Sequence, residues 1–127
     1  MDYKLAVIGI PVSDVDASIK FYVEQVGFNL DHDVRPREGM RVVQMTPEGS
    51  DCSVVIGEGM PLGEPGQMKG PQLVVEDIGA ARAELSGRGV EVTDVVQMGP
   101  EGAAGSRFVF FHDPDGNGWS IQEIKPA

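Results

Sequence analysis

Apolar and polar residues follow two different spacings along the first half of this chain. Residues 4–12 are mainly apolar and β-branched, which is typical of a strand. Apolar residues then recur three and four positions apart, which predicts a helix between Asp14 as its N-cap and Gly27 as its left-handed end. Short apolar runs near 28–34, 40–46 and 52–57 predict three further strands.

The second half repeats this order of elements. A strand is predicted near 70–75, a helix near 78–87 behind the cap Asp77, and strands near 90–97, 106–111 and 119–124. Asp14 and Asp77 are 63 positions apart (77 minus 14), about half of the 127 residues. We interpret the chain as one α+β domain of two βαβββ modules, 1–57 and 70–127, joined by a Gly- and Pro-rich linker at 58–69. Two such copies, related by a pseudo-twofold axis, are expected to enclose a cleft.

Charge and composition exclude several classes of function. The net charge of −10 argues against nucleic acid as a partner; it fits a solvated acidic surface and would also suit a cationic ligand. No apolar run approaches the roughly 20 residues that a membrane span needs, and the first residues do not form a signal peptide, so we expect a cytosolic protein. The single cysteine, Cys52, excludes an internal disulfide and a zinc site made of several thiolates.

Two segments carry a family resemblance. The early Val-Ser-Asp-Val-Asp-Ala-Ser-Ile-Lys-Phe-Tyr at 12–22 and the late Phe-Phe-His-Asp-Pro-Asp-Gly-Asn-Gly-Trp-Ser-Ile-Gln-Glu at 110–123 resemble the vicinal oxygen chelate superfamily. This superfamily includes glyoxalase I, extradiol dioxygenases, fosfomycin-resistance enzymes and bleomycin-binding proteins. The resemblance implies a U-shaped mixed sheet around a cleft, but no single function, because enzymes and binding proteins share this fold. It also implies a twofold homodimer, formed side by side or by exchange of modules.

The resemblance also indicates where a metal ion would bind. Metal-dependent members place one ligand on the first strand and one on the last strand of each module. Spacing from the capping aspartates and the internal repeat assign these positions to Val7, Val55, Gly70 and Gln122. Only Gln122 can donate to a metal, so we expect no metal cofactor. His32 and His112 fall in different modules and show no metal-binding spacing.

The last strand can face the cleft in two ways. If Trp119 and Ile121 pack under the helix, then Ser120 and Gln122 face the cleft. A shift of one residue would place Glu123 there instead. By the internal repeat, Ser53 and Val55 correspond to Ser120 and Gln122.

We therefore expect a metal-free protein that binds a small organic molecule, cationic or aromatic, as bleomycin-binding resistance proteins do. The expected ligand-binding residues are Gln122, Ser120, Ser53, Val55 and Val7. One alternative is an enzyme of the glyoxalase or dioxygenase type with one divalent ion. Another is a metal-free lyase or isomerase that uses Glu123 as its general base.

Overall fold

Two modules with the same order of elements make up the protein. The computed structural model describes residues 1–126, so the last position of the second predicted module, 127, lies outside the described residues. The first module contains β1 (Val7–Gly9), α1 (Val15–Ile19), the π-helical η1 (Lys20–Val26), β2 (Asn29–Arg37), β3 (Met40–Thr46) and β4 (Ser53–Glu58). The second contains β5 (Gln72–Val75), α2 (Ile78–Gly87), β6 (Val96–Gln97), β7 (Arg107–His112) and β8 (Gly118–Glu123). The predicted α+β class and the duplicated βαβββ order are confirmed.

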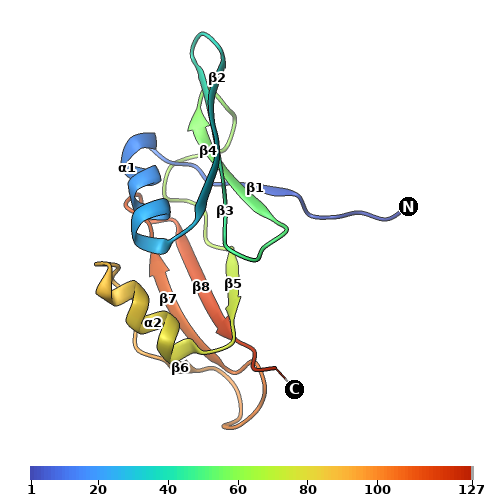
Figure 1. The fold of residues 1–127 in the computed structure, drawn as a ribbon, viewed down its shortest axis with the longest axis vertical. Helices are drawn as coiled ribbons and strands as arrows, with labels where there is room; N and C mark the ends of the chain where they lie inside the picture. Colours follow the sequence, from blue (N-terminus) through green and yellow to red (C-terminus); the bar gives the residue numbers. More distant parts are fainter. Residues whose placement is uncertain (127) are drawn as a thin grey trace.

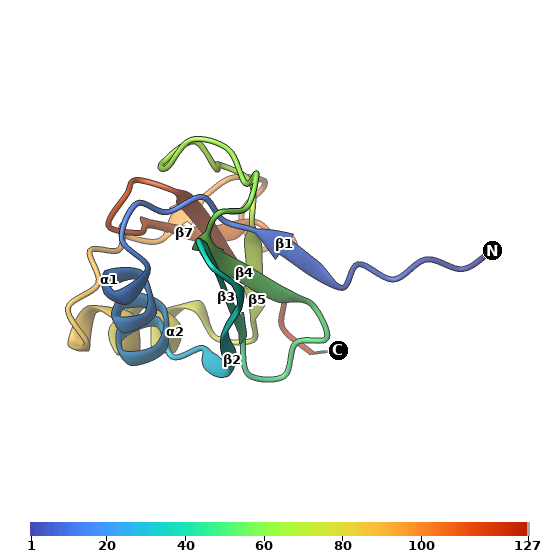
Figure 2. The same ribbon diagram turned by 90° about the horizontal axis from the view of Figure 1, so that it is seen from above.

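Each module forms a mixed sheet of four strands. The strand orders are β1-β4-β3-β2 and β5-β8-β7-β6, with the first and last strands of each module parallel and the other pairs antiparallel. The expected mixed sheet is thus divided into two sheets. The modules lie end to end along the long axis, with α1 and α2 on the same side (Figures 1 and 2). One face of each sheet is covered by a helix, and the opposite face is left open.

The helix caps lie where the sequence places them. The carboxylates of Asp14 and Asp77 accept hydrogen bonds from the amides of Ala17 and Ala80, each at 3.0 Å. The first helix ends at Gly27, which has a φ of 99°, a conformation that a side chain would strain. Its second half is π-helical, which the 3.6-residue spacing does not predict. No described helix has the length and apolar character that a membrane span requires.

Two predicted strands are shorter than expected. The first strand, predicted over 4–12, covers only Val7–Gly9, and residues 1–6 extend away from the body as an exposed tail (Figure 2). The strand predicted near 90–97 is reduced to Val96–Gln97. Here the Thr93 hydroxyl accepts the hydrogen bond of the Phe110 amide at 3.0 Å, so a side chain takes a place that a backbone carbonyl would have in a regular ladder.

A buried hydrogen-bond chain connects the two modules. The Tyr22 hydroxyl, from η1, donates to the Asp113 carboxylate at 2.7 Å and accepts from the Trp119 indole at 2.9 Å. All three side chains are almost fully buried. Burial, followed by the nearby Asp113 charge, raises the pKa of Tyr22 well above its ordinary value, so the phenol stays protonated and keeps donating.

The Asp-Pro-Asp-Gly-Asn turn supplies the remaining connections. The amide of the fully buried Asn117 donates to the Pro11 carbonyl at 2.7 Å, and its oxygen accepts from the Met68 amide at 3.1 Å. Asp115 accepts from the backbone and hydroxyl of Ser13 at 3.1 and 2.5 Å. The motif that carries the family resemblance therefore joins the first module, the linker and the second module.

Candidate functional site

The last strand, β8, separates the core from the open face of the second sheet. Trp119, Ile121 and Glu123 are 4%, 3% and 7% exposed and point to the helix-covered side. Ser120 and Gln122 alternate with them and point to the open face, where they are half-buried. The predicted packing of Trp119 and Ile121 is therefore confirmed, and Gln122 rather than Glu123 lies on the open face.

A row of hydrogen-bonding side chains crosses this open face. Gln72, on β5, pairs in register with Ser120. Its amide nitrogen donates to the Gln122 oxygen at 2.8 Å, and its oxygen accepts from the Ser120 hydroxyl at 3.3 Å. Gln122 in turn donates to the Gly105 carbonyl at 2.8 Å. The row holds its amides in fixed orientations, so that a ligand would meet donors and acceptors that are already positioned.

Two phenylalanines lie beside the polar row. Phe108 and Phe110 are the cross-strand partners of Gln122 and Ser120, so they share the open face. Their rings are 6.2 Å apart between centroids and only 11° from parallel. The sequence reasoning did not identify either phenylalanine as a site residue. Phe108 and Phe110 alternate with the buried Val109 and Phe111, and this strand alternation could have placed them on the open face.

The first module presents a matching open face. Val7 and Ser53 are partners in the parallel β1–β4 pair, and Val55 lies opposite Gln44 on β3. The Ser53 hydroxyl is 2.6 Å from that of Thr46 and accepts from Gln44 at 3.5 Å. Val7 is exposed and Val55 is half-buried, so this face presents two valines beside the polar Ser53 and Gln44.

The structure groups the expected ligand-binding residues on two separate faces. Ser120 and Gln122 lie together on the second sheet, whereas Val7, Ser53 and Val55 lie together on the first. None of the five main cavities within residues 1–126 is lined by members of both groups. The expected cleft between the two modules is therefore not found among these cavities of the single chain.

The strand register corrects one position assigned from spacing. Val7 pairs with Ser53 in the first module, and the equivalent Ser120 pairs with Gln72. Gln72, and not Gly70, is therefore the counterpart of Val7. The spacing from the capping aspartate is misleading because the connection from β5 to Asp77 is two residues shorter than that from β1 to Asp14.

The side chains at the four metal positions do not fit a divalent ion. Val7 and Val55 have no donor atoms, while Gln72 and Gln122 hydrogen-bond to each other. Residues 1–126 contain no cluster of three or more His, Cys, Asp or Glu side chains that could hold a metal ion. The exposed His32 and His112 lie on β2 and at the end of β7, in different modules.

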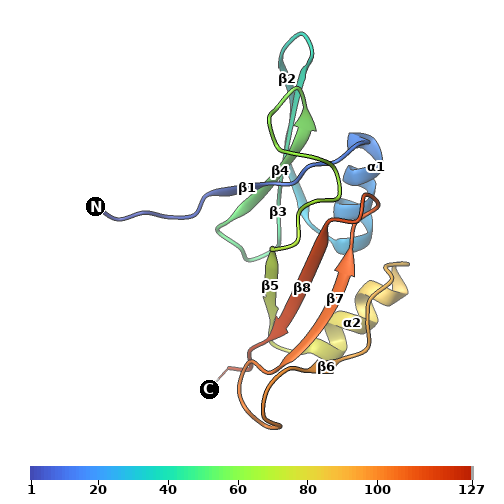
Figure 3. The same cartoon turned by 180° about the vertical axis from the view of Figure 1, so that it is seen from behind.

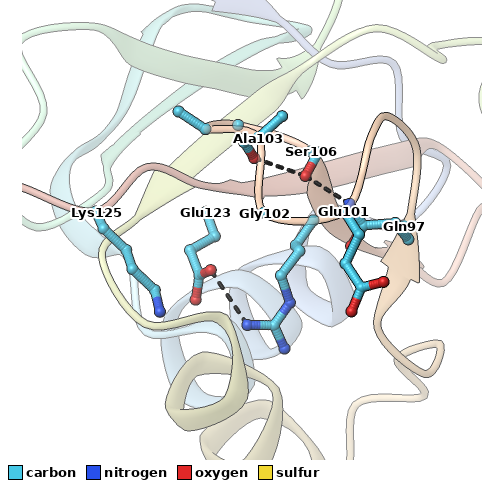
Figure 4. Close-up of a pocket in the computed structure, with 10 residues that line it drawn as sticks. Gln97, Glu101, Gly102, Ala103, Ser106, Glu123 and Lys125 are labelled. Atoms are coloured by element: carbon cyan, nitrogen blue, oxygen red, sulfur yellow. Dashed lines mark hydrogen bonds and ion pairs between the residues drawn. The ribbon is translucent and has the colours of Figure 1, made fainter.

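Glu123, the candidate general base, is held by two partners on the helix-covered side. Its carboxylate accepts from the Ile78 amide, at the first turn of α2, at 2.9 Å, and from the Arg107 guanidinium at 3.3 Å. The two contacts connect β8 to the start of α2 and to β7. Glu123 therefore acts as an anchor for α2, and it lines a cavity beside Arg107 (Figure 4).

Comparison with known proteins gives the family. The family model of the Glyoxalase/Bleomycin resistance protein/Dioxygenase superfamily matches residues 4–121. The chain belongs to this superfamily. No curated protein matches this chain.

Several solved structures resemble this superfamily member along almost its whole length. TnmS3, an antibiotic binding protein from Streptomyces sp. CB03234, is 35% identical, with a TM-score of 0.80 and 98% of each chain covered. A glyoxalase/bleomycin resistance protein from the same organism is 37% identical, with a TM-score of 0.76, over 94% of this chain and 100% of that one. A superfamily member from Sphaerobacter thermophilus DSM 20745 is 32% identical, with a TM-score of 0.81, over 96% and 98% of the two chains.

Proposed function

We propose that this protein binds a small organic molecule without a resident metal ion, in the manner of a drug-sequestering resistance protein. The observation that carries the proposal is the side-chain set Val7, Val55, Gln72 and Gln122 at the four metal positions, which leaves two amides and two aliphatic groups. The 35% identity to TnmS3, an antibiotic binding protein, gives independent support. Amides and apolar walls suit reversible binding, in which a few polar groups orient a ligand on an apolar surface.

The open face of the second sheet supports the proposal of a planar aromatic ligand. The near-parallel Phe108 and Phe110 rings provide an apolar aromatic surface against which a planar ring can pack. Gln72, Gln122 and Ser120 would donate to and accept from polar groups at the edge of that ring. The net charge of −10 favours a ligand that also carries a positive charge.

A second copy of the chain would complete the site. The strands β1 and β5 are unpaired edges of their sheets, and the open faces of both modules are uncovered. In a twofold dimer, the Val7, Ser53 and Val55 face of one chain can cover the Ser120 and Gln122 face of its partner. The ligand would then be enclosed between the two open faces.

The enzymatic alternatives have less support. A metal-dependent lyase, isomerase or dioxygenase needs ligands that the four family positions lack. A lyase or isomerase based on Glu123 needs a carboxylate that can reach the substrate in the cleft. Glu123 instead lies on the side of the sheet opposite Gln122, where it is hydrogen-bonded to Ile78 and Arg107.

A thermal-shift screen on chelator-treated protein tests the proposal. The panel contains metal-free bleomycin and flat aromatic antibiotics, each measured with EDTA and with added nickel, zinc, iron or manganese ions. A ligand at 100 times its dissociation constant stabilises the folded state by about 2.7 kcal/mol, which corresponds to a rise in Tm of roughly 10 °C for a domain of this size. We expect such a rise in EDTA. Stabilisation only with added metal, or one equivalent of metal in protein purified without chelator, would contradict the proposal.

A further inference from the structure

A cavity of about 550 Å³ lies at the far end of the second module. The loop 98–106, between β6 and β7, passes beneath the end of the second sheet (Figure 3) and covers one side of it. Gln122 and the two phenylalanines of the open face do not line this cavity, so it is distinct from the proposed ligand site. Its polar lining consists of Gln97, Glu101, Ser106, Arg107, Glu123 and Lys125 (Figure 4).

Hydrogen bonds hold the loop in place over the cavity. The Gln97 amide donates to the Ser106 hydroxyl at 2.7 Å, and this hydroxyl donates to the Ala103 carbonyl at 2.7 Å. At the other end, Gly105 has a φ of 71°, and its carbonyl is held by Gln122. Because the loop is already ordered, it loses less conformational entropy when a ligand binds.

Arg107 and Lys125 line the cavity, and most of their N–H groups donate no hydrogen bond to the described residues. Arg107 is 43% exposed at its side chain and gives one hydrogen bond, to Glu123, out of the five that a guanidinium can donate. Lys125 makes no hydrogen bond or ion pair with any residue between 1 and 126. The Glu123 carboxylate accepts one hydrogen bond from the Ile78 amide and one from Arg107. Two basic side chains, Arg107 and Lys125, thus face the cavity together with the carboxylates of Glu101 and Glu123.

We propose that this cavity is a second binding site, which takes a small organic monocarboxylate. The planar guanidinium of Arg107 matches a carboxylate with paired N–H groups, and Lys125 adds a point charge. A singly charged ligand is favoured over a phosphate dianion, because the carboxylates of Glu101 and Glu123 in the same wall repel each added negative charge. The volume lies within the range of roughly 300–1,000 Å³ that small-molecule sites occupy.

An NMR titration of the full chain with sodium benzoate tests this site. Spectra of ¹⁵N-labelled protein are recorded at pH 7 and constant ionic strength, with inorganic phosphate as a second probe. We expect saturable benzoate shifts at the backbone amides of Ser106 and Arg107, and weaker binding of phosphate. Lys125→Gln should raise the benzoate dissociation constant about tenfold, the effect of losing one charge-assisted hydrogen bond.

The control is Lys20→Gln, which makes the same change in net charge at an exposed lysine of η1, in the other module. It should leave the benzoate dissociation constant unchanged. Arg107→Lys keeps the charge but removes the planar fork, so it should also weaken binding about tenfold. Equal dissociation constants for wild type and Lys125→Gln, or benzoate shifts confined to Phe108 and Phe110 on the open face, would overturn the proposal. Neither result depends on whether the open face binds an antibiotic.

Discussion

Two neighbouring residues of β8 test the strand phase on which the candidate site rests. Ile121 is 3% exposed and belongs to the core, so Ile121→Ala should cost about 2–5 kcal/mol through lost burial and the cavity left behind. At about 4 °C per kcal/mol for a domain of this size, Tm should fall by roughly 8–20 °C. Gln122→Ala removes hydrogen bonds to Gly105 and Gln72 in a half-buried setting, at about 1 kcal/mol each, so its cost should stay near or below about 2 kcal/mol.

Urea unfolding, followed by the fluorescence of the single tryptophan, measures both variants. Equal m-values for wild type and the variants would show that they unfold to similarly exposed states, so that differences in midpoint report stability. Binding of a ligand from the thermal-shift screen is the second readout, and only there should Gln122→Ala have the larger effect. A greater loss of stability in Gln122→Ala than in Ile121→Ala would refute the assignment of Gln122 to the open face.

Three further predictions address the connections between modules, the pH dependence and the assembly. Tyr22→Phe leaves the buried Trp119 indole without its acceptor and should cost about 1–3 kcal/mol in urea unfolding; no loss would contradict the role of the Tyr22 hydroxyl. The hydrogen bond from Arg41 lowers the pKa of Asp33 in the folded protein. The pair therefore stabilises the fold fully above the ordinary aspartate pKa of about 3.9. This stabilisation is lost as the pH falls through the lower pKa of the folded state. Asp33→Asn should therefore reduce stability at pH 7 and flatten the acid dependence below about pH 4, and an unchanged acid profile would contradict the pairing. Light scattering coupled to size exclusion should give twice 13.6 kDa at tens of micromolar protein, whereas a mass near 13.6 kDa would refute the dimer.

The sequence predicted the features that local chemistry determines. The two capping aspartates and Gly27 lie as expected because an N-cap and a left-handed end depend on a few neighbouring residues. The alternation of Trp119, Ser120, Ile121 and Gln122 gave the correct strand phase, because one side of β8 is buried and the other is not.

Features that depend on pairing across the chain were not predicted. Gln72 was missed because its position follows from the β5–β8 register, and the shorter connection to Asp77 shifts it by two residues from Gly70. The role of Asn117 in joining both modules depends on Pro11, which lies 106 positions earlier in the chain. The partners of Glu123 were likewise not predicted, because Ile78 and Arg107 meet it only after α2 packs on the second sheet.

Isothermal titration tests the central claim, that the open face binds a small molecule without a metal ion. EDTA-treated wild type is titrated with the strongest ligand from the thermal-shift screen, and the titration is repeated after removal of EDTA and addition of one equivalent of zinc or nickel ions. The account predicts the same dissociation constant with and without metal, and a value at least about tenfold higher for the double variant Gln72→Ala/Gln122→Ala. Binding that requires the added ion, or that is unaffected by removal of both amides, would contradict it.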